Sequence, residues 1–190
     1  MGDGEAGRAS RVRAFVALEI PEPIGGTLAL YLDLCRAAAP AFRWVPPASL
    51  HLTLRFLGSV SPDVLDGLRS GLGRLDGRAF RLRLDGIGTF GGRAAPRVIW
   101  IDLREGAEQA AALAALVETA CQAAGMEPEA RRFRGHVTLA RARAARGSPL
   151  PELPPPPALE PWTATELVLY ESRLGKPAAT YVPLQRYRLG

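Results

Sequence analysis

The spacing of apolar residues predicts a chain in which strands alternate with helices. Residues 13–20 are almost continuously apolar, which is typical of a strand at the centre of a sheet. Residues 80–85 alternate strictly between apolar and polar side chains and predict a half-exposed strand, whereas 97–103 predict a second buried strand. Two late segments, 165–172 and 180–187, have the composition of strands and predict a closing hairpin.

Three segments predict helices. A helix near 22–38 has apolar residues at helical spacing: Ile24, Leu28, Tyr31, Leu32 and Cys35. A second helix begins at Ser61-Pro62-Asp63, which supplies a capping hydroxyl, a proline at the first helical position and an acid in the first turn. An alanine-rich helix is predicted over 106–124 and is capped by Gly125.

Glycine and proline mark the segments between these elements. Residues 86–96 hold four glycines, a proline and an isolated Phe90, so we expect a loop there. Seven prolines in 148–161 predict an extended connector, and Lys176-Pro177 predicts the turn of the hairpin. The glycine-rich residues 1–11 predict a disordered tail, which leaves 12–190 as one domain.

A short motif occurs twice, as His51-Leu52-Thr53-Leu54 and as His136-Val137-Thr138-Leu139, and the chain has two histidines in all. Side chains alternate between the two faces of a strand, so each histidine shares a face with the threonine two residues on. The apolar residues between them face the opposite side and can pack on a core. Two such strands could present two imidazoles and two hydroxyls to one small anion.

The order of the elements suggests a weak internal duplication. The chain reads strand, helix, motif strand, helix, strand, and then strand, helix, motif strand and hairpin. Each half would contribute a sheet with helices on its outer side and one motif strand to a central cleft. We expect an α+β fold with mainly antiparallel sheets.

Charge and composition narrow the class of protein. The net charge is +5, and Lys176 is the single lysine among 24 basic residues, so arginine dominates. Arginine suits phosphate and nucleic-acid contacts, although genome composition can produce the same bias. No apolar run approaches the length of a membrane span, and no secretory signal is visible at the N-terminus. Cys35 and Cys121 fall in helical patterns and are expected to be core thiols in a reducing cytoplasm.

The paired motifs predict acid–base chemistry at a phosphodiester. Imidazole titrates near neutral pH, so one histidine can act as a base while the other acts as an acid. Threonine hydroxyls would hydrogen-bond the non-bridging phosphate oxygens. Zinc-ligand spacing and a P-loop are both missing from the sequence, so we expect no metal and no cofactor. The alternative interpretation is a pair of structural histidines in half-buried strands.

The sequence resembles the 2H phosphoesterases, which are named for two HxT/S motifs, and within them the RNA 2′,3′-cyclic phosphodiesterases, also called 2′-5′ RNA ligases. The resemblance covers about residues 12–188. It rests on the segments 13–18, 51–58, Phe90 with 96–100, 133–141 and 169–172. It implies a bilobal, pseudo-duplicated fold of two mainly antiparallel sheets that face a central cleft, with helices outside.

The resemblance also implies roles for single residues. His51 and His136 would be catalytic, Thr53 and Thr138 would bind phosphate, and Arg141 would lie near the phosphate. Arg141 is five residues after His136, so a regular strand would turn it to the opposite face and a bulge or strand end must intervene.

Phe90 is a separate case. We expect it either to stack on the nucleobase at the mouth of the cleft or to fold back as a lid over the sheet edge.

The implied activity is metal-independent hydrolysis of a 2′,3′-cyclic phosphate on RNA or a small cyclic nucleotide, which leaves a 2′-phosphate. Two alternatives remain open at this level. One is ligation of 2′-5′ RNA junctions at the same site, and the other is a non-catalytic module that binds RNA ends or nucleotides. We expect a cytoplasmic monomer that does not bind membranes.

Overall fold

The computed structural model describes residues 11–175 and 179–190. The tail expected over 1–11 therefore lies outside the described residues except for Arg11, and so does the turn expected at Lys176-Pro177. The helices are α1 (Glu22–Ala38), α2 (Pro62–Leu72), α3 (Ala107–Ala123) and the short 3₁₀ helix η1 (Pro47–Ser49). The strands are β1 (Val12–Glu19), β2 (Phe42–Trp44), β3 (His51–Val60), β4 (Phe80–Gly91), β5 (Pro96–Glu105), β6 (His136–Ala142), β7 (Trp162–Ala164), β8 (Glu166–Arg173) and β9 (Thr180–Arg188).

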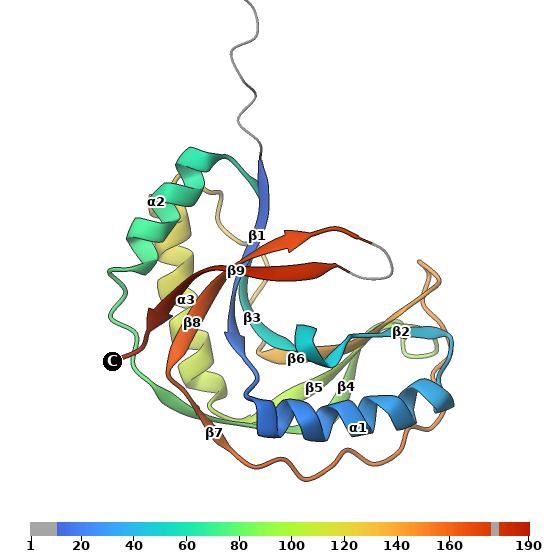
Figure 1. The fold of residues 1–190 in the computed structure, drawn as a ribbon. Helices are drawn as coiled ribbons and strands as arrows, with labels where there is room; N and C mark the ends of the chain where they lie inside the picture. The colour runs from blue at the N-terminus through green and yellow to red at the C-terminus, as the bar shows by residue number, and fades with distance from the viewer. Residues whose placement is uncertain (1–10, 176–178) are drawn as a thin grey trace, which may run out of the picture.

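These strands form one curled antiparallel sheet, which confirms the α+β class (Figure 1). The order is β7-β4-β5-β6-β3-β1-β8-β9, and β2 pairs with β6. The two motif strands, β3 and β6, are neighbours and pair at Leu52–Val137. The two sheets expected from the sequence are thus two halves of one sheet, joined at the motifs. The predicted hairpin is present as the β8–β9 pair.

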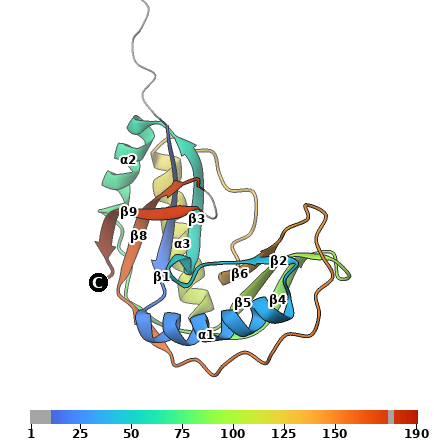
Figure 2. The ribbon, with the colours of Figure 1, turned by 45° about the vertical axis from the view of Figure 1, so that its right-hand side comes forward.

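The helices cover the two halves in a crossed arrangement (Figures 1 and 2). The helix α1 follows β1 in sequence but lies against the half that contains β4 and β5. The helices α2 and α3 pack together on the other half, where α3 contacts β3. The expectation that each half of the chain keeps its own helices is therefore wrong, because α1 and α3 exchange sides.

Local sequence accounts for the helices. The five predicted apolar positions of α1 are all buried, and the Ser61 hydroxyl accepts a hydrogen bond from the Val64 amide at the start of α2. In α3, Leu113, Val117, Ala120 and Cys121 are buried, whereas Leu116 is 37% exposed. Buried side chains from both halves of the sheet and from all three α-helices form one continuous core.

The prediction of a loop over 86–96 is wrong for 86–91, because β4 continues through Gly91 and pairs with β5, and it is confirmed for 92–95, which connect the two strands. The glycines in this part of β4 do not form a turn but serve the geometry of the strand. A Cβ on Gly88 would lie 2.1 Å from the Trp100 ring, and Gly86 has a φ of +77° at a bulge in β4. Glycine therefore makes room for an aromatic ring here and permits a bulge, instead of marking a turn.

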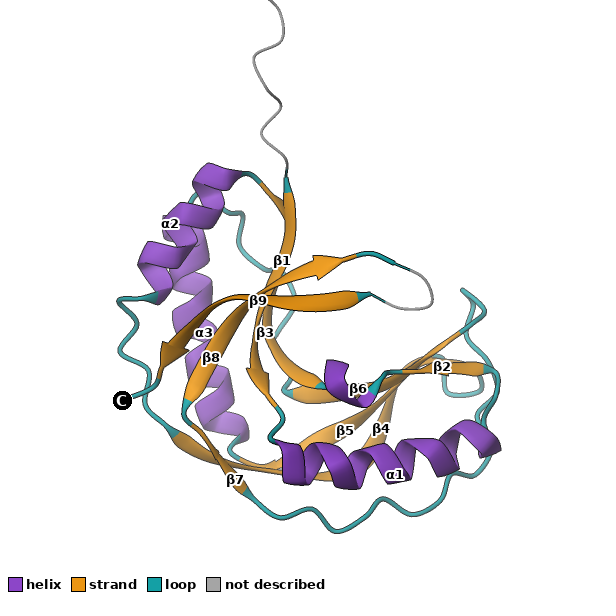
Figure 3. Ribbon diagram, viewed as in Figure 1, coloured by secondary structure: helices purple, strands orange, loops and turns teal. Residues whose placement is uncertain are grey.

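The proline-rich connector is present as predicted. Residues 148–161 contain no helix or strand, and the connector passes around α1, as the teal segment in Figure 3 shows. The Tyr31 hydroxyl of α1 donates to the Pro154 carbonyl at 3.1 Å, which fixes the connector to the helix. Within the described chain, no helix combines the length and the apolar character needed to cross a membrane.

Candidate active site

The two motifs meet where the halves of the sheet join. Leu52 and Val137 are fully buried and directly opposite each other in an antiparallel pair. This register sets His51 across from Thr138 and Thr53 across from His136, on the face away from the core. The two imidazoles and the two hydroxyls that the sequence predicted are therefore brought together in one square of side chains.

Each imidazole is held by a hydrogen bond to the backbone carbonyl two residues before it. His51 Nδ1 lies 2.8 Å from the Ser49 carbonyl oxygen, and His136 Nδ1 lies 2.8 Å from the Arg134 carbonyl oxygen. A carbonyl can only accept, so Nδ1 carries the proton in each ring. In the neutral state Nε2 of each histidine is then the free basic nitrogen.

Aromatic rings pack against each histidine and leave it half-buried. The His51 ring centroid lies 4.7 Å from Phe15 and 5.1 Å from Tyr181. The His136 centroid lies 5.0 Å from Phe90 and 6.0 Å from Trp100.

This burial lowers the pKa of both histidines, because the charged form loses hydration. The backbone hydrogen bond opposes the fall of each pKa. The Arg141 guanidinium lowers the pKa of both rings, which shows that its charge acts on both sides of the site.

A bulge in β6 turns Arg141 toward the site. In the pairing with β5, Thr138 lies opposite Trp100 and Ala140 opposite Ile99, so Leu139 is an extra residue. The alternation of faces shifts by one there, and both Leu139 and Ala140 are buried while Arg141 is exposed. Of the two possibilities that the odd spacing left open, a bulge or a strand end, the structure contains the bulge.

The first motif has the same bulge. In the pairing of β3 with β1, Thr53 lies opposite Ala17 and Arg55 opposite Val16, so Leu54 is the extra residue. The leucine that ends each HxTL motif is therefore the bulge residue in both copies. By this correspondence, Phe56 occupies in β3 the position that Arg141 occupies in β6.

A pocket of about 750 Å³ opens beside these side chains, and it is lined by residues of β3, β6, α3 and the segment before β6, with Phe90 and Val98. Five of the six predicted site residues line it: Thr53, Phe90, His136, Thr138 and Arg141. His51 is not among its lining residues. Phe90 is half-buried within β4 and contacts both His136 and Trp100, so its ring belongs to the wall beside the catalytic face.

Several contributors to the site were missed by the sequence reasoning. Arg134 holds His136 through its carbonyl, lies 4.3 Å over the Trp100 ring and pairs with Asp102 at 3.4 Å. Arg134 lies two residues before His136, as Ser49 lies two residues before His51. This shared spacing could have identified Arg134 from the sequence. No local signal marks Tyr181, which reaches His51 from the distant strand β9.

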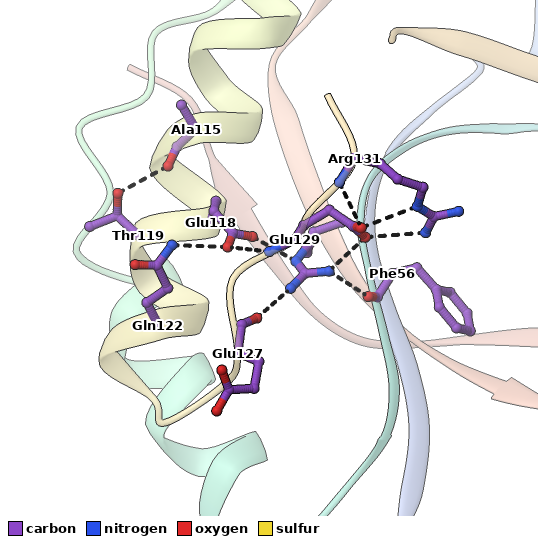
Figure 4. Close-up of polar contacts among 9 residues, drawn as sticks. Phe56, Ala115, Glu118, Thr119, Gln122, Glu127, Glu129 and Arg131 are labelled. Carbon is purple, nitrogen blue, oxygen red and sulfur yellow. Dashed lines mark hydrogen bonds and ion pairs between the residues drawn. The ribbon is translucent and has the colours of Figure 1, made fainter. Parts of the chain in front are cut away.

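The segment that precedes β6 is fastened to β3 by an ionic cluster around Arg55 (Figure 4). The Arg55 side chain is 10% exposed and pairs with Glu118 of α3 at 2.6 Å and with Glu129 at 2.9 Å. It also donates to the Glu127 carbonyl at 2.9 Å. Arg55 therefore connects the strand of Thr53 to the segment that supplies the carbonyl partner of His136.

This fold and this paired HxT site define a phosphoesterase of the two-histidine class. The family described as LigT like Phosphoesterase matches residues 18–100 and 101–181, and the chain belongs to this family.

Individual relatives agree with the family assignment. The chain is similar to the RNA 2′,3′-cyclic phosphodiesterase of Aeropyrum pernix, with 34% identity over 124 residues that span 65% of this chain and 70% of that protein. The protein of the same name from Escherichia coli K12 is 30% identical over 177 residues, 93% of this chain and 96% of the relative. The solved structure of E. coli LigT complexed with 3′-AMP has 31% sequence identity and a TM-score of 0.79, covering 94% and 98% of the two chains.

Proposed function

We propose that this phosphoesterase hydrolyses 2′,3′-cyclic phosphates of RNA ends and nucleotides to 2′-phosphates, without a metal ion. The observation that carries the proposal is the square of two imidazoles and two threonine hydroxyls around the Leu52–Val137 pair. Each Nδ1 is committed to a backbone carbonyl, so each Nε2 is left to exchange a proton with the substrate. Relatives named for this activity support the same substrate class.

In the proposed reaction, His136 Nε2 removes a proton from water as its oxygen forms the new bond to phosphorus. The bond from phosphorus to the 3′-oxygen breaks, and the His51 imidazolium gives that oxygen a proton. Thr53, Thr138 and Arg141 hold the non-bridging oxygens, where negative charge develops. The histidines exchange protonation states during one turnover, and solvent restores them.

The assignment of base and acid is supported by access to the pocket. His136 lines the open pocket, through which water can enter, whereas His51 is enclosed between Phe15 and Tyr181. An acid that serves a leaving group of the bound substrate needs no contact with bulk water during the bond-breaking step. A base that activates water does need it.

The metal-free mechanism is supported by the donor set. Among the described residues, no group of three or more histidine, cysteine, aspartate or glutamate side chains is arranged to hold a metal ion. The nearby cations are arginines, which can neutralise a cyclic phosphate directly.

The two alternatives make different demands on the site. Ligation would use the same histidines in reverse and needs a second RNA end, with a 5′-hydroxyl, held in line with the phosphate. A binding module would need no free Nε2 on either ring, whereas both rings are arranged to leave it free. The free Nε2 atoms therefore support a catalytic site over a binding module, and the abundance of water supports hydrolysis over ligation unless a 5′-hydroxyl end is held in place.

The test is incubation of the purified protein with 2′,3′-cyclic nucleotides in the presence of EDTA, followed by identification of the product isomer. We expect full turnover with EDTA and a 2′-phosphate product. Loss of activity on chelation that is restored by a metal ion, or a 3′-phosphate product, would contradict the mechanism.

A further inference from the structure

Phe56 is an aromatic side chain on the site face that the core does not use. It follows the Leu54 bulge, lies opposite Phe15 in the sheet and lines the same pocket as Thr53 and Phe90. It is 39% exposed, and the Arg13 guanidinium lies 4.6 Å from the ring centroid. A flat ring partly open to the pocket and accompanied by an arginine is suited to stacking on a nucleobase.

The same part of the pocket is basic. Its rim includes Arg131, Arg132 and Arg134, and its acids are Glu118 and Glu129, which are both paired with Arg55. Among the described residues, Arg13, Arg132 and Arg141 form no ion pair, so their charges are available to an anionic ligand. Aromatic rings interleaved with arginines are the usual lining of a channel for single-stranded nucleic acid.

We propose that Phe56, Arg13 and Arg132 form a subsite for the nucleotide that precedes the one carrying the cyclic phosphate. The inference rests on the proposed function and adds that the preferred substrate is an RNA oligonucleotide. Phe90, which touches His136, takes the terminal base. Phe56 lies three residues beyond Thr53, past the Leu54 bulge, and takes the next base.

The test compares a 2′,3′-cyclic mononucleotide with a tetranucleotide RNA that ends in the same cyclic phosphate. Phe56→Ala should lower kcat/KM for the tetranucleotide about tenfold, the usual effect of losing one stacked base, and change it less than twofold for the mononucleotide. Phe56→Tyr keeps a ring and should retain the preference. Arg132→Ala should weaken tetranucleotide binding and flatten its dependence on salt.

Matched controls separate the subsite from general effects. Leu34→Ala removes another exposed apolar side chain, 61% exposed on α1, and Arg74→Ala removes an exposed arginine after α2. Neither residue lines the pocket, so both variants should behave as the unaltered protein toward both substrates. If Phe56→Ala slows both substrates equally or affects neither, the subsite does not exist.

A binding measurement keeps this inference distinct from the proposed function. The probe is a fluorescent tetranucleotide with a terminal 2′-phosphate, and its anisotropy reports affinity without turnover. A weaker affinity of Phe56→Ala and Arg132→Ala supports the subsite even if cyclic phosphates are not hydrolysed. Unchanged affinity in both variants overturns the subsite even if hydrolysis is confirmed.

Discussion

At the scale of single residues, His51 and His136 are equivalent in their backbone anchoring and differ in their surroundings. His51→Ala and His136→Ala should each lower kcat by roughly 10² to 10⁴, the usual contribution of a general acid or base. The measurement is steady-state turnover of a cyclic nucleotide, with thermal unfolding of each variant as the control for folding. Full activity in either folded variant would exclude that histidine from the chemistry.

The lowered pKa values of the two histidines predict an acidic optimum. In the free enzyme kcat/KM is maximal between the two pKa values of the pair, and burial and Arg141 hold both below the ordinary value of about 6.5. The maximum of kcat/KM should therefore lie below pH 6.5. A bound phosphate anion favours the imidazolium and should move the kcat profile toward higher pH. A flat profile, or a kcat/KM maximum above pH 8, would rule out the pair as the titrating groups.

At the scale of elements, the cluster around Arg55 joins β3, α3 and the segment before β6. Arg55→Met leaves Glu118 and Glu129 without their shared partner and should lower the free energy of unfolding by about 2–3 kcal/mol. It should also reduce kcat, because the carbonyl that holds His136 belongs to the segment that is released. Urea unfolding and turnover measure the two effects.

Arg69→Met is the matched control for that prediction. Arg69 pairs with Asp66 one turn apart on the exposed face of α2, and such a pair contributes roughly 0–1 kcal/mol. A similar small loss of stability in both variants, with normal turnover in Arg55→Met, would mean that the Arg55 cluster neither anchors the segment nor positions His136.

At the scale of the whole molecule, the two halves of the sheet share one core and should unfold together. The three tryptophans, Trp44, Trp100 and Trp162, lie on β2, β5 and β7 of one half, while α2 and α3 cover the other. Tryptophan fluorescence therefore reports on one half, whereas far-ultraviolet circular dichroism reports on the helices and strands of both halves. Their urea midpoints should coincide, and separated midpoints would show that the halves unfold independently.

The sequence by itself determined the features that depend on neighbours along the chain. The spacing of apolar residues located α1, and Ser61 with Pro62 located the start of α2, because helical periodicity and capping act within one or two turns. The two HxTL motifs located the histidines and threonines of the site. The odd spacing of Arg141 required a bulge or a strand end before it, because alternation along a strand is a local rule, and the structure places a bulge at Leu139.

Only the tertiary structure decided how these pieces meet. Residues 86–91 of the predicted loop belong to a strand in which Gly88 accommodates Trp100, a contact between strands that composition does not encode. Residues far apart in sequence meet at the Leu52–Val137 pair and where Tyr181 approaches His51. The exchange of sides by α1 and α3 likewise depends on contacts between distant segments. Such contacts depend on the burial of a shared core, so they are fixed only when the whole sheet curls around it.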